Sequence, residues 1–286
     1  MAEMLTVLDV VQRSSVFLEG KGVESPRLNA EWLIASSLGI DRMKLYMQFD
    51  RPLNENELTD MRSKVARRAK REPLQYILGT APFHELELKV DARALIPRPE
   101  TEQLVELAID SLGENDGAYR ILDLGTGTGA IALALAFALP RAEVFALDAS
   151  KEALELAQEN AIGCGLQNRV TFVLSDWFTD LEEPGDFDMI VSNPPYLTDE
   201  EMGTAEPEVR DFEPLSALRA DRDGLADLET IMEGAFARLK EGGVLWLETG
   251  IAHRESLESF GARIGYHDVI GTDDWSGRPR FVKAIR

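Results

Sequence analysis

From residue 119 onward, short apolar segments alternate with helical ones, and this alternation constrains the fold more than any other feature of the sequence. It is typical of right-handed βαβ units, which build a mostly parallel sheet with helices on both faces. No helix separates the last two predicted strands, so we expect those two to be antiparallel. The predicted strands are 120–124, 142–148, 169–174, 186–192, 243–249, 265–270 and 280–285, and the predicted helices are 128–139, 150–162, 225–240 and 251–263.

The chain before this region follows other patterns. Residues 1 to about 72 carry apolar positions at three- and four-residue steps, which predicts helices. Residues 83–90 alternate between apolar and polar, which predicts a strand, and a second short strand near 94–96 would complete a hairpin. We therefore expect three parts: a small all-α domain for substrate recognition at 1–75, a linking β-hairpin at 76–98 and an α/β catalytic domain at 99–286.

Charge is distributed unevenly along the chain, whose net charge is −21. Residues 1–75 carry 12 Lys and Arg against 11 Asp and Glu, whereas residues 76–286 carry 18 against 40. Proteins bind phosphate backbones through Lys and Arg, so the acidic catalytic half argues against a nucleic-acid substrate and favours a protein partner. The basic end of the predicted helix before residue 72 is interpreted as a solvated face or as a docking surface for an acidic or RNA-bearing partner.

Other compositional features exclude several classes of site and location. One cysteine and three histidines disfavour a metal site, a disulfide and a histidine-built triad. No stretch approaches 18 consecutive apolar residues, and residues 1–5 lack the basic start of a signal peptide. We expect a soluble, cytoplasmic monomer without a metal or a membrane contact.

A glycine-rich loop follows the strand 120–124 and precedes a strong helix. Its glycines let the backbone approach a ligand, and the N-terminus of the helix offers unpaired N–H groups to a nucleotide-like cofactor. The loop alone leaves NAD and S-adenosylmethionine open. The residues expected to line the cofactor here are Gly125, Thr126, Gly127, Thr128 and Gly129.

Three further side chains follow predicted strands at the same edge of the sheet. Asp148 ends the second strand, where it is placed to bind ribose hydroxyls. Trp177 follows the third strand and is interpreted as packing on an adenine ring or as filling the core. Asp123 lies within the first strand, where holding the loop and contacting the cofactor remain equally open.

An Asn-Pro-Pro-Tyr sequence, residues 193–196, stops the fourth strand of this region. Methylation of a planar NH₂ group is difficult because its lone pair is delocalised. The side-chain oxygen of Asn193 and the backbone carbonyl of Pro194 can accept both N–H hydrogens, so that the lone pair turns toward an electrophile. Pro195 would help to hold the substrate, and Tyr196 would stack on the planar group. Adenine and glutamine both present such a group, so the motif indicates the reaction more firmly than the substrate.

Four segments together resemble the peptide-chain release factor glutamine N5-methyltransferases, the PrmC/HemK family. The first motif, Asp-Leu-Gly-Thr-Gly-Thr-Gly, is similar to that of S-adenosylmethionine-dependent methyltransferases. The resemblance spans nearly the whole chain, although residues 247–250 and 274–278 match the family pattern only loosely. The segments that carry it are 95–102 (Leu-Ile-Pro-Arg-Pro-Glu-Thr-Glu), 125–129, 193–196 and 212–218 (Phe-Glu-Pro-Leu-Ser-Ala-Leu).

This resemblance implies a Rossmann-like, seven-stranded class I fold that uses S-adenosyl-L-methionine as its methyl donor. The implied substrate is the glutamine in the Gly-Gly-Gln motif of class I release factors, methylated at its side-chain nitrogen N5. Asn193 would contact both cofactor and substrate, and Asn193, Pro194 and Tyr196 would be the catalytic residues. The alternatives are an adenine-N6 nucleic-acid methyltransferase, a non-catalytic nucleotide-binding protein and, more distantly, an NAD-dependent oxidoreductase. The acidic segment 198–224 is interpreted as a lid, a partner contact or a solvated loop.

Overall fold

The computed structural model describes residues 5–113, 117–181, 186–222 and 224–286. The N-terminal residues 1–4, which carry most of the expectation about a signal peptide, lie outside these ranges. The chain divides into two compact units. One holds residues 1–79 and 206–212, and the other holds residues 80–205 and 213–286.

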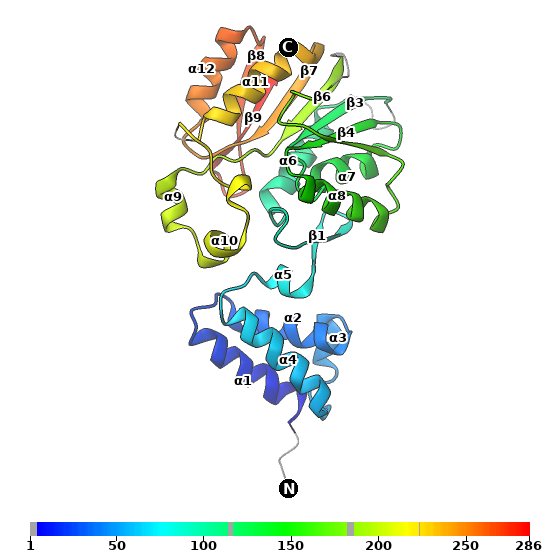
Figure 1. Cartoon of the computed structure of the whole chain (residues 1–286), viewed down its shortest axis with the longest axis vertical. Coiled ribbons are helices and arrows are strands. Elements are labelled where there is room, and N and C mark those ends of the chain that lie inside the picture. The colour runs from blue at the N-terminus through cyan, green and yellow to red at the C-terminus, as the bar shows by residue number, and fades with distance from the viewer. Residues whose placement is uncertain (1–4, 114–116, 182–185, 223) are drawn as a thin grey trace. The chain divides into compact units, whose positions relative to one another are not determined.

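The first unit is helical, as the apolar spacing predicts (Figure 1). The helix α2 begins with a proline in its first turn, and Asn54 caps α4 by accepting from the backbone N–H of Glu57 at 3.0 Å. The core of this unit is built from buried aliphatic side chains such as Leu18, Leu33 and Met61. Its helices are α1 (Val7–Glu19), α2 (Pro26–Leu38), α3 (Arg42–Tyr46), α4 (Glu55–Arg68) and α5 (Leu74–Leu78).

The short helix α10 (Pro207–Phe212) groups with this helical unit although it comes late in the chain. Its Glu208 accepts hydrogen bonds from Arg68 and Arg71, each at 2.7 Å, and Arg68 is itself buried. Part of the basic end of α4 therefore pairs with an acidic residue of the same chain.

The hairpin lies at the predicted place, but its strands differ from the prediction. Strand β1 (Thr80–Phe83) pairs antiparallel with β2 (Leu86–Lys89), and a tight turn at His84 and Glu85 joins them. His84 has a positive φ of 49° there. The expected second strand near residues 94–96 is wrong, because that segment has no strand partner and instead lines the cavity described below.

The second unit contains a seven-stranded sheet in the order β5-β4-β3-β6-β7-β9-β8 (Figure 1). The first five strands in this order are parallel, and β9 runs antiparallel to both β7 and β8, as expected for the C-terminal pair. The strands are β3 (Arg120–Leu124), β4 (Glu143–Asp148), β5 (Val170–Leu174), β6 (Phe187–Ser192), β7 (Leu239–Glu248), β8 (Asp268–Asp273) and β9 (Pro279–Ile285).

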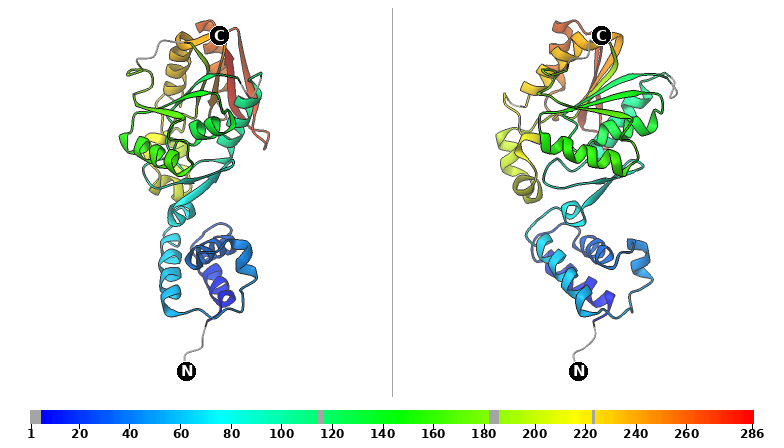
Figure 2. Two further views of the ribbon diagram at one scale, coloured as in Figure 1. Left: turned by 90° about the vertical axis from the view of Figure 1, so that its right-hand side faces the viewer. Right: turned by 45° about the vertical axis from the view of Figure 1, so that its right-hand side comes forward.

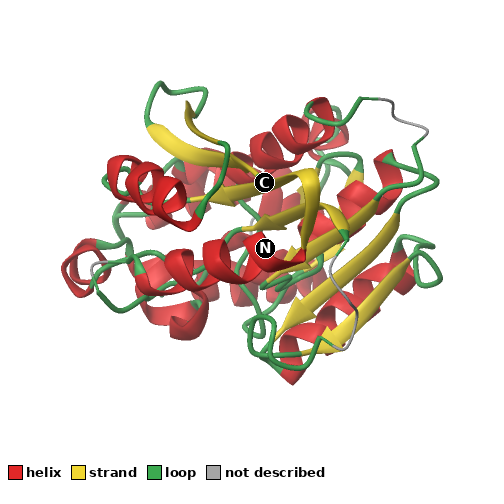
Figure 3. Cartoon of the chain, turned by 90° about the horizontal axis from the view of Figure 1, so that it is seen from above, coloured by secondary structure: helices red, strands yellow, loops and turns green. Residues whose placement is uncertain are grey.

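Helices cover both faces of this sheet (Figures 2 and 3). Successive side chains of a strand point to opposite faces, so Met189 and Val191 join one core while Ile190 joins the other. The first core also contains α6 (Pro99–Asp110), α7 (Ala130–Ala138) and part of α8 (Lys151–Gly163), and the second contains α11 (Ala226–Arg238) and α12 (Arg254–Ile264).

Several elements depart from their predicted bounds: β8 lies three residues later than predicted, and α12 begins three residues later. Strand β7 begins at Leu239, four residues before the predicted start, across a register shift opposite β6. The acidic segment 198–224 also contains two short helices, α9 (Asp199–Thr204) and α10, and a 3-10 turn at Leu215–Ala217. Among the described residues, no helix has the length and apolar character needed to cross a membrane.

Candidate active site

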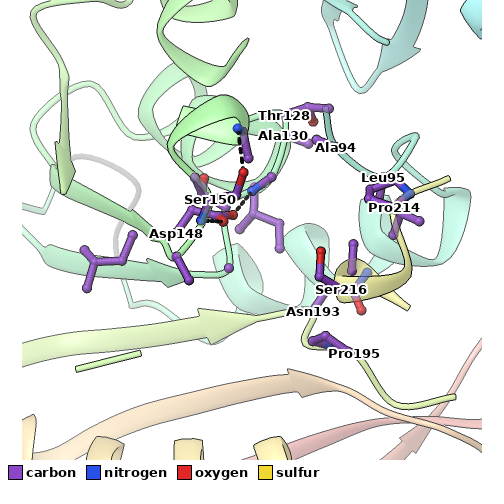
Figure 4. Close-up of a pocket in the computed structure, with 18 of the residues that line it drawn as sticks. Ala94, Leu95, Thr128, Ala130, Asp148, Ser150, Asn193, Pro195, Pro214 and Ser216 are labelled. Atoms are coloured by element: carbon purple, nitrogen blue, oxygen red, sulfur yellow. Dashed lines mark hydrogen bonds between the residues drawn. The ribbon is translucent and has the colours of Figure 1, made fainter. Parts of the chain in front are cut away.

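A cavity of about 500 Å³ lies at the carboxyl ends of the central strands. The strand order reverses between β3 and β6, and ligands of open α/β sheets bind at such a switch point. The loops that follow β3, β4, β5 and β6 all contribute lining residues. Figure 4 shows Asp148 and Ser150 on one side of this cavity and Asn193 and Pro195 on another.

The glycine loop forms the cofactor side of the cavity. Its three glycines have φ values of 71°, 56° and 83°, in the left-handed region that favours glycine. Gly129 is the N-cap residue of α7, so the unpaired N–H groups of that helix begin at the cavity wall. Of the five loop residues predicted to hold the cofactor, Gly129 is not a lining residue. The other four line the cavity: Gly125, Thr126, Gly127 and Thr128.

Asp123 and Asp148 have different roles around this loop. Asp123 is fully buried and accepts from the Thr126 hydroxyl at 2.6 Å and from the Ala132 N–H at 3.1 Å. Burial raises the pKa of Asp123 to about 7. It therefore holds the loop from behind, which is one of the two roles left open by the sequence.

Asp148 instead lines the cavity. Its carboxylate accepts from the backbone N–H groups of Gly127 and Ser150, both at 2.8 Å. Each carboxylate oxygen keeps a lone pair for another donor, so the side chain is fixed in place and still able to accept ribose hydroxyls. Burial raises the pKa of Asp148 above its ordinary value.

Trp177 lines the cavity and also packs against the core on the α11 face of the sheet. Its backbone has a positive φ of 47°, held by the Ser175 hydroxyl, which donates to the Trp177 carbonyl at 2.9 Å. Asp227 is another lining residue that the sequence did not indicate; burial raises its pKa, and the Trp177 side chain opposes that shift. The packing of Trp177 against this core agrees with the second interpretation, and its contact with an adenine ring stays a prediction.

Asn193 follows β6 directly and lines the cavity on the side away from the glycine loop. Its side-chain Nδ2 donates to the hydroxyl of Thr101 in α6 at 3.0 Å. Pro195 also lines the cavity, whereas Pro194 is buried and Tyr196 is half-buried, and neither is a lining residue.

Tyr196 points its hydroxyl into the protein. That hydroxyl donates to Oε1 of Glu248 at 3.1 Å, and the Arg280 guanidinium lies 5.8 Å from the centre of the ring. Burial, followed by the charge of Glu248, raises the pKa of Tyr196 above its ordinary value. Tyr196 is therefore a neutral hydrogen-bond donor at physiological pH.

An ion pair with a buried carboxylate stabilises another wall of the cavity. Arg98 donates to both oxygens of Glu213 at 2.7 Å, and Glu213 is only 5% exposed. Glu213 begins the segment whose Pro214, Ser216 and Ala217 line the cavity. The pair joins two of the motifs that carry the family resemblance.

Sequence reasoning assigned no role to Thr101, Glu213, Asp227 or Glu248. One local feature could have indicated Glu248. It is a charged residue directly after an apolar run, which places it at the same edge of the sheet as Asn193. Thr101 and Glu213 lie within the motifs of the resemblance. Asp227 is an ordinary helix residue in the sequence and left no signal.

The chain is similar to known proteins over almost its whole length. A family model described as the PrmC N-terminal domain matches residues 9–79, and one described as a methyltransferase domain matches residues 115–268. A release factor glutamine methyltransferase of Geobacter sulfurreducens is 43% identical, over 98% of this chain and 96% of the relative. Those of Rhodopirellula baltica and Vibrio cholerae are 39% and 40% identical, covering 97% and 96% of this chain and 95% of each relative.

Solved structures support the same fold at lower identity. A methyltransferase from Pyrococcus furiosus has a TM-score of 0.53 at 20% identity, over 71% of this chain and 89% of that one. The hMettl16 catalytic domain has a TM-score of 0.59 at 19% identity, over 78% and 79%. These matches confirm the predicted class I methyltransferase sheet with a helical N-terminal domain.

Proposed function

Because this chain belongs to the release factor glutamine methyltransferase family, we propose that it methylates the glutamine of the Gly-Gly-Gln motif in class I peptide chain release factors. The methyl donor is S-adenosyl-L-methionine, and the nitrogen that accepts the methyl group is N5 of the glutamine side chain. The products are the methylated factor, S-adenosyl-L-homocysteine and the proton that the amide nitrogen loses after transfer.

The observation that carries the proposal is the placement of Asn193 on the wall of the cavity that also holds the glycine loop and Asp148. We assign Gly125 to Gly129, Asp148 and Trp177 to the cofactor, with Asn193 facing both cofactor and substrate. When the cofactor is bound, its positively charged sulfonium is the electrophile. The assigned residues would hold the cofactor as a whole by backbone N–H groups, a carboxylate and an indole.

At the acceptor end, Asn193, Pro194, Pro195 and Tyr196 hold the glutamine amide. The Oδ1 atom of Asn193 and the carbonyl of Pro194 each accept one N–H hydrogen, which restrains the nitrogen with its lone pair toward the methyl group. Tyr196 shapes this end through its bond to Glu248. The chain supplies geometry and hydrogen-bond acceptors, and no general base is required before transfer.

We propose a protein rather than a nucleic-acid substrate because the catalytic half is strongly acidic. We also propose that the protein acts as a monomer. Release factors act on the ribosome, so we place the reaction in the cytoplasm. We assign residues 1–75 to recognition of the intact factor, 76–98 to the link and 99–286 to transfer.

The test is a methylation assay with intact release factor, its Gly-Gly-Gln peptide, RNA and DNA offered separately. We expect one methyl group on the glutamine, located by peptide mass spectrometry, and faster transfer to the intact factor. A factor whose motif glutamine is replaced by Glu is the control and should remain unmodified. Methylation of RNA or DNA with an unmodified factor would overturn the proposal.

A further inference from the structure

Asn193 is one end of a chain of side-chain hydrogen bonds that runs from the cavity wall, where Thr101 also lies, into the protein. Asn193 Nδ2 donates to Thr101 Oγ1 at 3.0 Å, and that hydroxyl donates to Glu248 Oε2 at 2.7 Å. Tyr196 donates to the other oxygen of Glu248. Thr101 is 4% exposed and Glu248 is 1% exposed, so water has little access to the bond between these two side chains.

The fold brings these residues together from three distant segments. Strands β6 and β7 are parallel with Ser192 opposite Leu247, so Asn193 and Glu248 leave the sheet side by side. Thr101 lies in the first turn of α6.

The direction of each bond follows from the chemistry of the groups. While Glu248 is ionised, its carboxylate accepts hydrogen bonds and donates none, so the single hydrogen of the Thr101 hydroxyl must point to Glu248. The hydroxyl oxygen can then only accept from Asn193. This requires the NH₂ group of Asn193 to face Thr101 and leaves Oδ1 as the atom available to a ligand.

We infer that Thr101 and Glu248 are positioning residues that fix the amide orientation of Asn193 so that its oxygen, not its NH₂ group, faces the glutamine. In the opposite orientation two donors would meet, and the acceptor amide would lose one of the bonds that restrain it. This inference rests on the proposed function and adds to it a device that selects an acceptor bearing N–H hydrogens.

The test compares three substitutions in the full-length protein with intact release factor as substrate. Thr101→Val keeps the shape of the side chain but removes the hydroxyl, and we expect kcat to fall about 100-fold, the scale of a small misplacement at a reacting group. S-adenosylmethionine affinity should stay within about threefold, because Thr101 does not bond to the glycine loop or Asp148. Thr101→Ser restores the hydroxyl and should recover most of the rate.

Glu248→Gln provides an independent route to the same test. A glutamine offers an oxygen to only one of Thr101 and Tyr196, so the Thr101 hydroxyl is free to donate to Asn193 and allow its amide to turn. We expect kcat to fall about tenfold, and the double variant Thr101→Val with Glu248→Gln to be no slower than Thr101→Val alone. Thr230→Val is the matched control, since within the described part of the chain that exposed hydroxyl bonds only to the Ala226 carbonyl of its own helix.

Circular dichroism and cofactor binding check that each variant is folded. If Thr101→Val does not fold, Glu248→Gln and Thr101→Ser decide the question. The inference is overturned if folded Thr101→Val and Glu248→Gln both keep kcat within about threefold of the wild type. It is also overturned if Thr101→Ser is as slow as Thr101→Val. A wild-type protein that leaves the factor unmodified instead contradicts the proposed function.

Discussion

The loops after β3 and β6 leave neighbouring strands of one sheet and line one cavity, yet they are built differently. The loop after β3 presents backbone N–H groups and is held by two carboxylates, Asp123 and Asp148. The loop after β6 presents the side chain of Asn193, held by Thr101 and, through it, by Glu248.

This difference matches what each side has to do. The cofactor is held by many backbone and side-chain groups together, so removing one weakens binding without abolishing it. The acceptor amide depends on a few groups whose orientation matters as much as their presence. We therefore expect substitutions on the β3 side to change cofactor affinity and substitutions on the β6 side to change turnover.

The largest effect is expected at Asn193. Asn193→Ala removes an acceptor that restrains the glutamine nitrogen, and kcat should fall about 1,000-fold, as for the loss of a key polar group in other active sites. Cofactor affinity, measured by calorimetry, should stay within about tenfold. If calorimetry showed no cofactor binding, Asn193 would belong chiefly to the cofactor side and the comparison would fail.

Asp148→Ala should produce the opposite pattern. Loss of the carboxylate removes the proposed ribose contact and releases the Gly127 N–H, so Kd for S-adenosylmethionine should rise about 10- to 100-fold. At saturating cofactor, kcat should change only a few-fold. Asp180→Ala, an exposed aspartate beyond the same sheet edge, is the control. A large loss of kcat with unchanged Kd would move Asp148 to the acceptor side.

The raised pKa of Asp123 is expected to make the free energy of unfolding, rather than cofactor binding, depend on pH. Its pKa of about 7 lies above that of an unfolded aspartate, so the native state holds the proton more tightly. The free energy of unfolding should then fall by up to about 1.4 kcal/mol per pH unit as pH rises from about 4 to 7, and level off above that. Asp123→Asn should remove this contribution and leave the smaller slope due to the other buried carboxyls, such as Asp148, in urea unfolding at pH 5, 6 and 8. An unchanged slope would show that Asp123 is already ionised.

The smallest effect concerns the pH profile of turnover. Burial raises the pKa of Glu248, which faces Tyr196, Arg280 and Glu100. A protonated Glu248 no longer forces the Thr101 hydroxyl to donate to it, so kcat should decline several-fold as pH falls through that pKa. The assay uses saturating cofactor because Asp123 and Asp148 also titrate. Thr101→Val should show a flatter acidic limb, and identical limbs in both proteins would argue against Glu248 as the cause.

The sequence predicted the βαβ order, the glycine loop and Asn193 because each depends on local pattern: period-2 burial, glycine at positive φ and a proline stop. It missed the start of β7 because two consecutive glycines, Gly242 and Gly243, are not typical of a strand. Their backbones instead form hydrogen bonds with Arg286 at the far end of the chain. It missed the role of Thr101 because its partner Glu248 lies 147 residues away. Contacts of this kind have no period and no local signature.

The most direct test of the central claim is a crystal structure of the protein with S-adenosyl-L-homocysteine and a Gly-Gly-Gln peptide. The account predicts the glutamine amide nitrogen at about 3 Å from both Asn193 Oδ1 and the Pro194 carbonyl, with Asn193 Nδ2 still bonded to Thr101. The cofactor should lie against the glycine loop and Asp148 with its sulfur toward that nitrogen. A glutamine whose carbonyl oxygen, rather than its nitrogen, meets Asn193 would contradict the account.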